Sequence, residues 1–160
     1  MRRTVSCLLL TAMMLLPWAC DSIDCTLYNT VTCQCSFYGS DGSAVSITDP
    51  LTVTTCGVDS ILINKMSSVS KLDLPLSYWQ DADTIVLTVE GEDYAIQDTM
   101  WIEKTNTPHF ESPDCPTNMF HNLKEIRVTH NFIDSVNILQ PLVNYDQTEN
   151  LQIYLRTAVD

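Results

Sequence analysis

The chain has 160 residues, of which 45% are hydrophobic and 18% charged, so it is long enough to form one domain with its own core. It carries 20 acidic against 8 basic residues, a net charge of −12. Such a charge repels nucleic-acid phosphates and anionic lipid headgroups, which argues against nucleic-acid binding and against polybasic docking to membranes.

Residues 1–19 have the layout of a signal peptide. Arg2 and Arg3 precede the apolar run VSCLLLTAMMLLPWA, and the polar sequence CDSID follows it directly. The run is shorter than the ~20 apolar residues of a membrane-spanning helix, so we expect a cleaved leader. Its removal would leave 6 basic against 20 acidic residues, a net charge of −14, on an exported domain.

The sequence LLPWAC resembles a lipobox, in which a cysteine follows the cleavage site. Ala19 precedes Cys20, with leucines at −4 and −5, whereas Pro17 and Trp18 depart from the usual residues. Pro17 also makes a poor site for an ordinary signal peptidase, which prefers small residues at −1 and −3. We therefore expect lipidation of Cys20 and anchoring in the cell envelope, at the outer membrane and facing the periplasm or the surface. An ordinary cleaved or retained leader is the alternative.

Behind Cys20 we expect an acylated tether, residues 20–30, and one domain, residues 31–160. Apolar residues recur at every second position in this domain and no helical period appears, which predicts strands. Asp41-Gly42 is typical of a tight turn, and Pro75 places its segment at a sheet edge. The pattern predicts an all-β fold, a single antiparallel, immunoglobulin-like β-sandwich of about seven to nine strands. The expected segments are TCQCSFY (32–38), the short SAVSI (43–47), LTVTTC (51–56), SILIN (60–64), KLDLPLSY (71–78), TIVLTV (84–89), TMWIEK (99–104), a loop over 105–118, LKEIRVTH (123–130), FIDSVNIL (132–139) and LQIYLR (151–156).

Four of these segments share a local pattern, an aspartate followed by Ser or Thr and an apolar strand: DSILI, DTIVL, DTMWI and DSVNI. Aspartate side chains close turns by accepting hydrogen bonds from nearby backbone N–H groups, so we interpret these as turn residues. Four aspartates gathered at one end could instead bind calcium, but the spacing matches no calcium-binding loop.

Five of the seven cysteines are available for disulfides once the leader and the lipidated residue are set aside. An exported chain meets oxidising conditions, so disulfides are expected, and the odd number leaves one thiol over. Cys33 and Cys35 lie two positions apart in a strand, on the same face, and are poorly placed to bond each other. We expect the pairs Cys35–Cys56 and Cys25–Cys115, with Cys33 as the odd thiol. An exchange of Cys33 with Cys35 or Cys25 remains open.

No motif indicates catalysis. His109, Cys115 and His121 have an H-x5-C-x5-H spacing, wider than the close ligand pairs of zinc sites, so Cys115 is better interpreted as a disulfide partner. The chain has no G-x-S-x-G sequence and only four glycines, too few for a phosphate-binding glycine loop. We expect a non-enzymatic protein without a metal site or cofactor.

Aromatic residues offer a weak candidate for ligand binding. Tyr78 and Trp79 lie in SYWQDAD, a turn sequence in which an exposed indole could stack on a sugar. Trp101 alternates with Met100 and Ile102, so one face of its strand belongs to the core. The competing interpretation is that these aromatic residues are core or edge cover, as is usual in sandwiches.

The order of these features resembles a known group of proteins. The features are the lipobox, then Cys25 after SID, and then CSFYGSDGSAV, LTV, DSILIN, DLPLSY, DTIVLTV, DTMWIE, TNTPHFESPDC and ENLQIYL. In this respect the chain resembles the small, uncharacterised lipoproteins of Bacteroidota, with one domain behind a loose lipobox. The resemblance implies an envelope β-domain and supports the pairing of Cys25 with Cys115. It carries over no catalytic or binding residue.

From the sequence we expect a lipid-anchored cell-envelope protein that serves as an interaction or accessory module of an envelope assembly, with an outer-membrane protein as its partner. The alternative is a surface lipoprotein that binds glycan through Tyr78, Trp79 and Trp101.

Overall fold

The computed structural model describes residues 30–56, 60–113 and 115–156. Residues 1–29, and with them Cys20 and Cys25, lie outside these ranges. Within the described ranges the chain forms strands and turns without a helix, so it has no helix that could cross a bilayer. The strands are β1 (Cys33–Tyr38), β2 (Leu51–Thr55), β3 (Ser60–Met66), β4 (Lys71–Leu74), β5 (Ala82–Glu90), β6 (Ala95–His109), β7 (Asn118–Val128), β8 (Ile133–Ile138), β9 (Leu142–Val143) and β10 (Glu149–Leu155).

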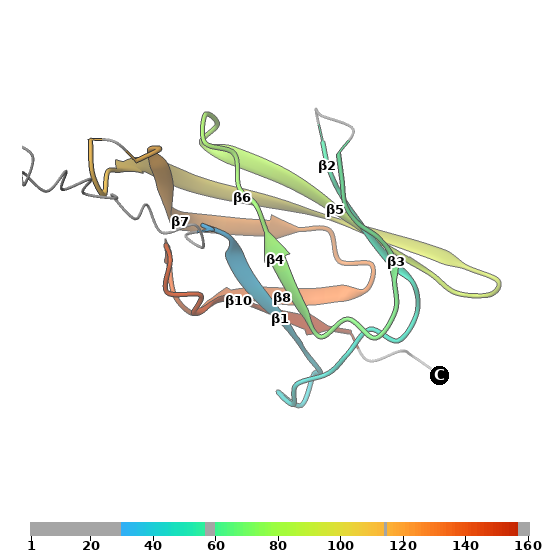
Figure 1. The fold of residues 1–160 in the computed structure, drawn as a ribbon. Coiled ribbons are helices and arrows are strands. Elements are labelled where there is room, and N and C mark those ends of the chain that lie inside the picture. Colours follow the sequence, from blue (N-terminus) through green and yellow to red (C-terminus); the bar gives the residue numbers. More distant parts are fainter. Residues whose placement is uncertain (1–29, 57–59, 114, 157–160) are drawn as a thin grey trace, which may run out of the picture.

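The strands form two sheets that share one hydrophobic core (Figure 1). The four-stranded sheet has the order β4-β1-β10-β8, and the six-stranded sheet has the order β3-β2-β5-β6-β7-β9. Alternate residues point inward, as in β1, where Cys33, Cys35 and Phe37 are buried. In Figure 1, β6 runs along most of the length of the molecule, so its two ends lie at opposite ends of the fold. The expected all-β class is confirmed.

The sheets are not purely antiparallel, because β1 pairs with β10 in parallel. The register shifts between Gln34 and Cys35, because β10 has a bulge with one extra residue, Asn150, between their partners Glu149 and Leu151. Asn150 supports the bulge: its side-chain oxygen accepts the Gln34 N–H at 3.0 Å, and its amide donates to the carbonyls of Gln140 and Leu142. The parallel pair and the ten strands seen in the described residues depart from the antiparallel arrangement of seven to nine strands that the sequence predicted.

Two of the local predictions are wrong. The segment SAVSI, residues 43–47, forms only two isolated bridges, one at each end. The expected loop over 105–118 is shorter, because β6 continues to His109 and β7 begins at Asn118. Beyond Glu103, β6 pairs with β7 alone, so Pro108 can enter the strand without depriving a second neighbour of a hydrogen bond.

The predicted Cys35–Cys56 disulfide is also wrong, since Cys33, Cys35 and Cys56 are free thiols. Strands β1 and β2 belong to different sheets, and Cys35 faces the core while Cys56 is exposed just past β2. Cys33 and Cys35 share a face as expected, with sulfur atoms 4.0 Å apart. The hydrogen bond with Cys33, together with burial, raises the pKa of Cys35 well above its usual value, so this thiol stays protonated and unreactive. Cys115 is disulfide-bonded, as expected, whereas Cys25 lies outside the described ranges, so Cys25 as its partner stays a prediction.

Asp98 of β6 organises the turn between β7 and β8. Its buried carboxylate accepts hydrogen bonds from the Thr129 hydroxyl at 2.5 Å and from the backbone N–H groups of Asn131, Phe132 and Ile133 at 2.9, 2.8 and 2.7 Å. A buried carboxylate that accepts this many hydrogen bonds fixes the backbone that supplies them. The aspartate of DTMWI therefore closes a turn, as expected, but a turn about thirty residues away in sequence rather than the one before its own strand.

Candidate functional site

The segment Ser77–Asp81, here called the Trp79 loop, connects β4 to β5. Trp79 is 89% exposed and Tyr78 is 39% exposed. The backbone N–H groups of Trp79 and Gln80 both donate to the Ser77 hydroxyl, at 3.3 and 3.2 Å. This is the local hydrogen bonding by which serine closes short turns, so the loop has a defined conformation of its own.

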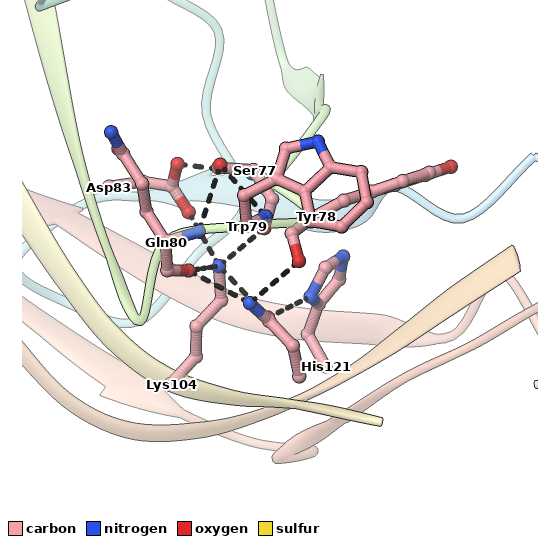
Figure 2. A network of polar contacts seen from close by, with 8 residues as sticks. Ser77, Tyr78, Trp79, Gln80, Asp83, Lys104 and His121 are labelled. Carbon is pink, nitrogen blue, oxygen red and sulfur yellow. Dashed lines mark hydrogen bonds and ion pairs between the residues drawn. The ribbon is translucent and has the colours of Figure 1, made fainter. Parts of the chain in front are cut away.

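Lys104 of β6 fixes the Trp79 loop through hydrogen bonds to its backbone carbonyls. Its side chain is fully buried, and Nζ donates to the carbonyls of Ser77 and Gln80 at 2.7 and 2.5 Å and to Asn106 Oδ1 at 3.0 Å. Asp83 Oδ2 lies 3.2 Å from Nζ and forms an ion pair with it, while Asp83 Oδ1 accepts the Ser77 N–H. Figure 2 shows the ammonium group inside the bend of the loop. A buried ammonium is stable only with such a set of partners, which here fix the loop backbone.

Asn106 completes the support and orients His121. Its amide nitrogen donates to the carbonyls of Tyr78 and Gln80 at 3.1 and 2.9 Å. Its Oδ1 accepts from Lys104 and lies 2.7 Å from His121 Nδ1. Because Oδ1 is an acceptor, Nδ1 must be the protonated nitrogen of the imidazole, and the other ring nitrogen, Nε2, carries a lone pair.

His121 is neutral at neutral pH. Its side chain is 1% exposed, and burial lowers its pKa from 6.5 to about 4. The charge of Lys104 lowers the pKa further, and that of Asp83 opposes the change. Nε2 is buried and has no hydrogen-bond partner within the described residues. The ring of Tyr78 lies 6.1 Å from the imidazole, tilted by 43°.

The structure separates the aromatic residues that the sequence grouped. Tyr78 and Trp79 share the Trp79 loop, whereas Trp101 lies on β6 with its side chain on the opposite face from the buried Ile102 and Lys104. Trp101 lines a shallow groove with residues of β7 and β8. It does not join Trp79 in one platform.

The candidate histidine and cysteine residues form no metal centre. His109 stacks on Phe120 with ring centroids 4.2 Å apart, and His121 is engaged with Asn106. Across residues 30–56, 60–113 and 115–156, no group of three or more His, Cys, Asp and Glu side chains could hold a metal ion. Phe110, next to His109, is 68% exposed and forms a second exposed aromatic position, separate from the Trp79 loop.

Lys104 and Asn106 were missed by sequence reasoning, which considered His121 only as a possible metal ligand. A signal was present in TMWIEKTN, where the two-residue period places Lys104 and Asn106 on the same face as Met100 and Ile102. A lysine on the inner face of a strand needs buried acceptors, which the sequence alone does not locate.

The model of one protein family matches residues 50–155, which is more than half of the chain. The chain belongs to DUF6452, a family of unknown function. The matched range begins just before β2 and ends with β10, so it contains the Trp79 loop and every residue that supports it. The expectation of an uncharacterised family is thus confirmed. Comparisons with curated proteins and with solved structures gave no match.

Proposed function

We propose that the protein is a non-enzymatic, lipid-anchored protein of the cell envelope that binds glycan through the Trp79 loop. The observation that carries the proposal is the Trp79 indole, 89% exposed on a loop whose carbonyls are held by Lys104 and Asn106. A ligand that stacks on this indole buries a large aromatic surface. Because the loop is already fixed, little conformational entropy is lost on binding.

The distribution of exposed apolar side chains favours a glycan over a protein partner. Ile61 and Met66 lie on β3 and Tyr94 follows β5, so these side chains are not part of the Trp79 loop. A stable protein interface buries about 800 Å² on each partner, with an apolar centre. One exposed indole, by contrast, matches the area of a single sugar ring.

The second candidate function is an interaction or accessory module of an envelope assembly, with an outer-membrane protein as partner. The same tryptophan favours it, since Trp is among the residues most enriched at the energetic centres of protein interfaces. In this case Trp79 would enter a pocket of the partner rather than stack on a sugar.

The test compares the wild type with Trp79→Ala, and uses Phe110→Ala as a matched control at another exposed aromatic position, outside the Trp79 loop. On a glycan array we expect the wild type and the control to bind, and Trp79→Ala to lose about tenfold or more in affinity, because burial of a large side chain contributes about 1.5–3 kcal/mol. Each of the three proteins is also expressed in cells, extracted in mild detergent and purified, and the proteins that co-purify with it are identified. No glycan binding, together with Trp79-dependent recovery of an identified outer-membrane protein, would favour the second candidate. If the wild type binds no glycan and no partner protein is recovered with it, both candidate functions are rejected.

Lipid anchoring at Cys20 is part of the proposal. Cells fed radioactive palmitate should label the wild-type chain and leave Cys20→Ser unlabelled, because the thiol that accepts the diacylglycerol is absent. Equal labelling of both chains, or of neither, would contradict lipidation of Cys20 and the expected location at the outer membrane that depends on it.

Two finer points complete the proposal. We assign the chain to the Bacteroidota-type lipoproteins that its sequence resembles, and we describe its two sheets as an immunoglobulin-like sandwich. A crystal structure of the lipidated chain, compared strand by strand with immunoglobulin domains, would test the second point.

A further inference from the structure

His121 holds an unused hydrogen-bond acceptor beside the Trp79 loop. Its Nδ1–H is donated to Asn106 Oδ1 at 2.7 Å, which leaves the Nε2 lone pair without a partner in the described part of the chain. Figure 2 shows the imidazole of His121 next to the Trp79 loop, with a hydrogen bond at one of its two ring nitrogens. An unsatisfied buried acceptor costs about 1–3 kcal/mol, so a donor that reaches it gains free energy.

Among the residues that the structure describes, this site offers hydrogen-bond acceptors and no cation that a ligand could reach. The ammonium of Lys104 is surrounded by three hydrogen-bond acceptors and by Asp83 Oδ2 at 3.2 Å. Asp83 balances its charge, and because the side chain is fully buried a ligand cannot reach it. Asp81 at the end of the loop is exposed and adds negative charge. A ligand with carboxylate, sulfate or phosphate groups would therefore meet repulsion without a compensating ion pair.

We propose that the ligand is a neutral glycan, with one ring stacked on Trp79 and one hydroxyl group donating a hydrogen bond to His121 Nε2. The inference rests on the proposed glycan binding and adds the ligand class and a second binding residue. It assigns His121 the role of selecting a hydroxyl donor, since a neutral imidazole with Nδ1 protonated can only accept at Nε2.

Tyr78 is the gate to this acceptor. The centroid of its ring lies 6.1 Å from that of the imidazole, and the residue is partly exposed, while its backbone carbonyl accepts a hydrogen bond from Asn106. The proposal requires that rotation of the Tyr78 side chain uncovers Nε2, and the anchored carbonyl allows this rotation without movement of the loop. Side-chain rotation of a partly exposed residue is fast compared with ligand binding, so the cover does not prevent access.

The experiment is a nitrogen NMR titration of the full lipidated chain in detergent micelles, with histidine labelled at both ring nitrogens. The neutral probes are maltohexaose, cellohexaose and mannohexaose, and the acidic probe is hexagalacturonate. With a neutral probe that binds, the His121 Nε2 resonance should move upfield, as a nitrogen lone pair does when it accepts a hydrogen bond, while Nδ1 stays in place. His130 and His109 serve as internal controls and should not move.

The matching variant is His121→Phe, which keeps an aromatic ring and removes the Nε2 acceptor together with the Nδ1–H bond to Asn106. Its affinity for the neutral probe should fall about tenfold, the equivalent of one hydrogen bond to a buried acceptor, while quenching of Trp79 fluorescence at saturation is retained. The inference is overturned if a neutral probe binds in a Trp79-dependent manner without a shift of Nε2, or if hexagalacturonate binds as tightly as the neutral probes. Both results leave the proposed function standing. Absence of any Trp79-dependent binding would overturn the function and the inference together.

Discussion

Replacement of Lys104 by methionine is expected to lower the free energy of unfolding by roughly 3–5 kcal/mol, the usual cost of removing one partner of a buried ion pair. The carboxylate of Asp83 would lose its counter-ion, and the carbonyls of Ser77 and Gln80 would lose their donor. Methionine fills a similar volume, so the loss is electrostatic and not a packing defect. Urea denaturation followed by circular dichroism measures the change.

The matched control is Lys124→Met, at an exposed lysine on the neighbouring strand β7. Its effect should stay within about 0.5 kcal/mol, as for most surface substitutions. If Lys104→Met does not fold, the double variant with Asp83→Asn, which also removes the unpaired charge, should recover part of the loss. An effect of Lys104→Met no larger than that of the control would contradict the structural role of the buried ammonium.

Asp98→Ala is expected to destabilise the fold by about 4 kcal/mol or more. Four donors lose their acceptor at once, and three of them are backbone N–H groups of the turn between β7 and β8. Each buried donor left without a partner costs about 1–3 kcal/mol, although water that enters the gap recovers a share. Thermal unfolding by calorimetry measures the effect as a lower melting temperature.

Asp134→Ala is the control, because Asp134 stands in the same Asp-Ser/Thr pattern on β8 but is exposed. Its ion pair with Arg156 is long, with 3.9 Å between Oδ1 and Nε. It should cost less than about 1 kcal/mol. Asp98→Asn should lie between the two, since the amide keeps one acceptor and turns a second donor toward the N–H groups. Similar melting temperatures for the two alanine variants would refute the assignment of Asp98 as the anchor of the turn.

The sequence was sufficient for the class of fold and for most strands, because period-two alternation is a local signal. β5 and the middle of β6 follow directly from TIVLTV and TMWIEK. Which strands pair with each other is not encoded locally, and for this reason the predicted Cys35–Cys56 disulfide is wrong. The expected bridge assumed that consecutive strands pair, whereas β1 pairs with β4 and β10 and leaves β2 to the other sheet.

For the site, the sequence located the exposed indole but not what supports it. SYWQDAD reads as a turn, and Trp79 is indeed exposed there. The contacts of Lys104 and His121 with this loop span more than twenty sequence positions, so they depend on the β5–β6–β7 register rather than on any motif. The protonated nitrogen of His121 could be assigned only once its partner on Asn106 was known.

Isothermal titration calorimetry of the neutral hexasaccharides against wild type, Trp79→Ala and Phe110→Ala tests the central claim most directly. We expect saturable binding with one site for wild type and Phe110→Ala, and an affinity about tenfold lower or undetectable for Trp79→Ala. Equal affinities in all three proteins, or no heat of binding with the wild type, would contradict glycan recognition by the Trp79 loop.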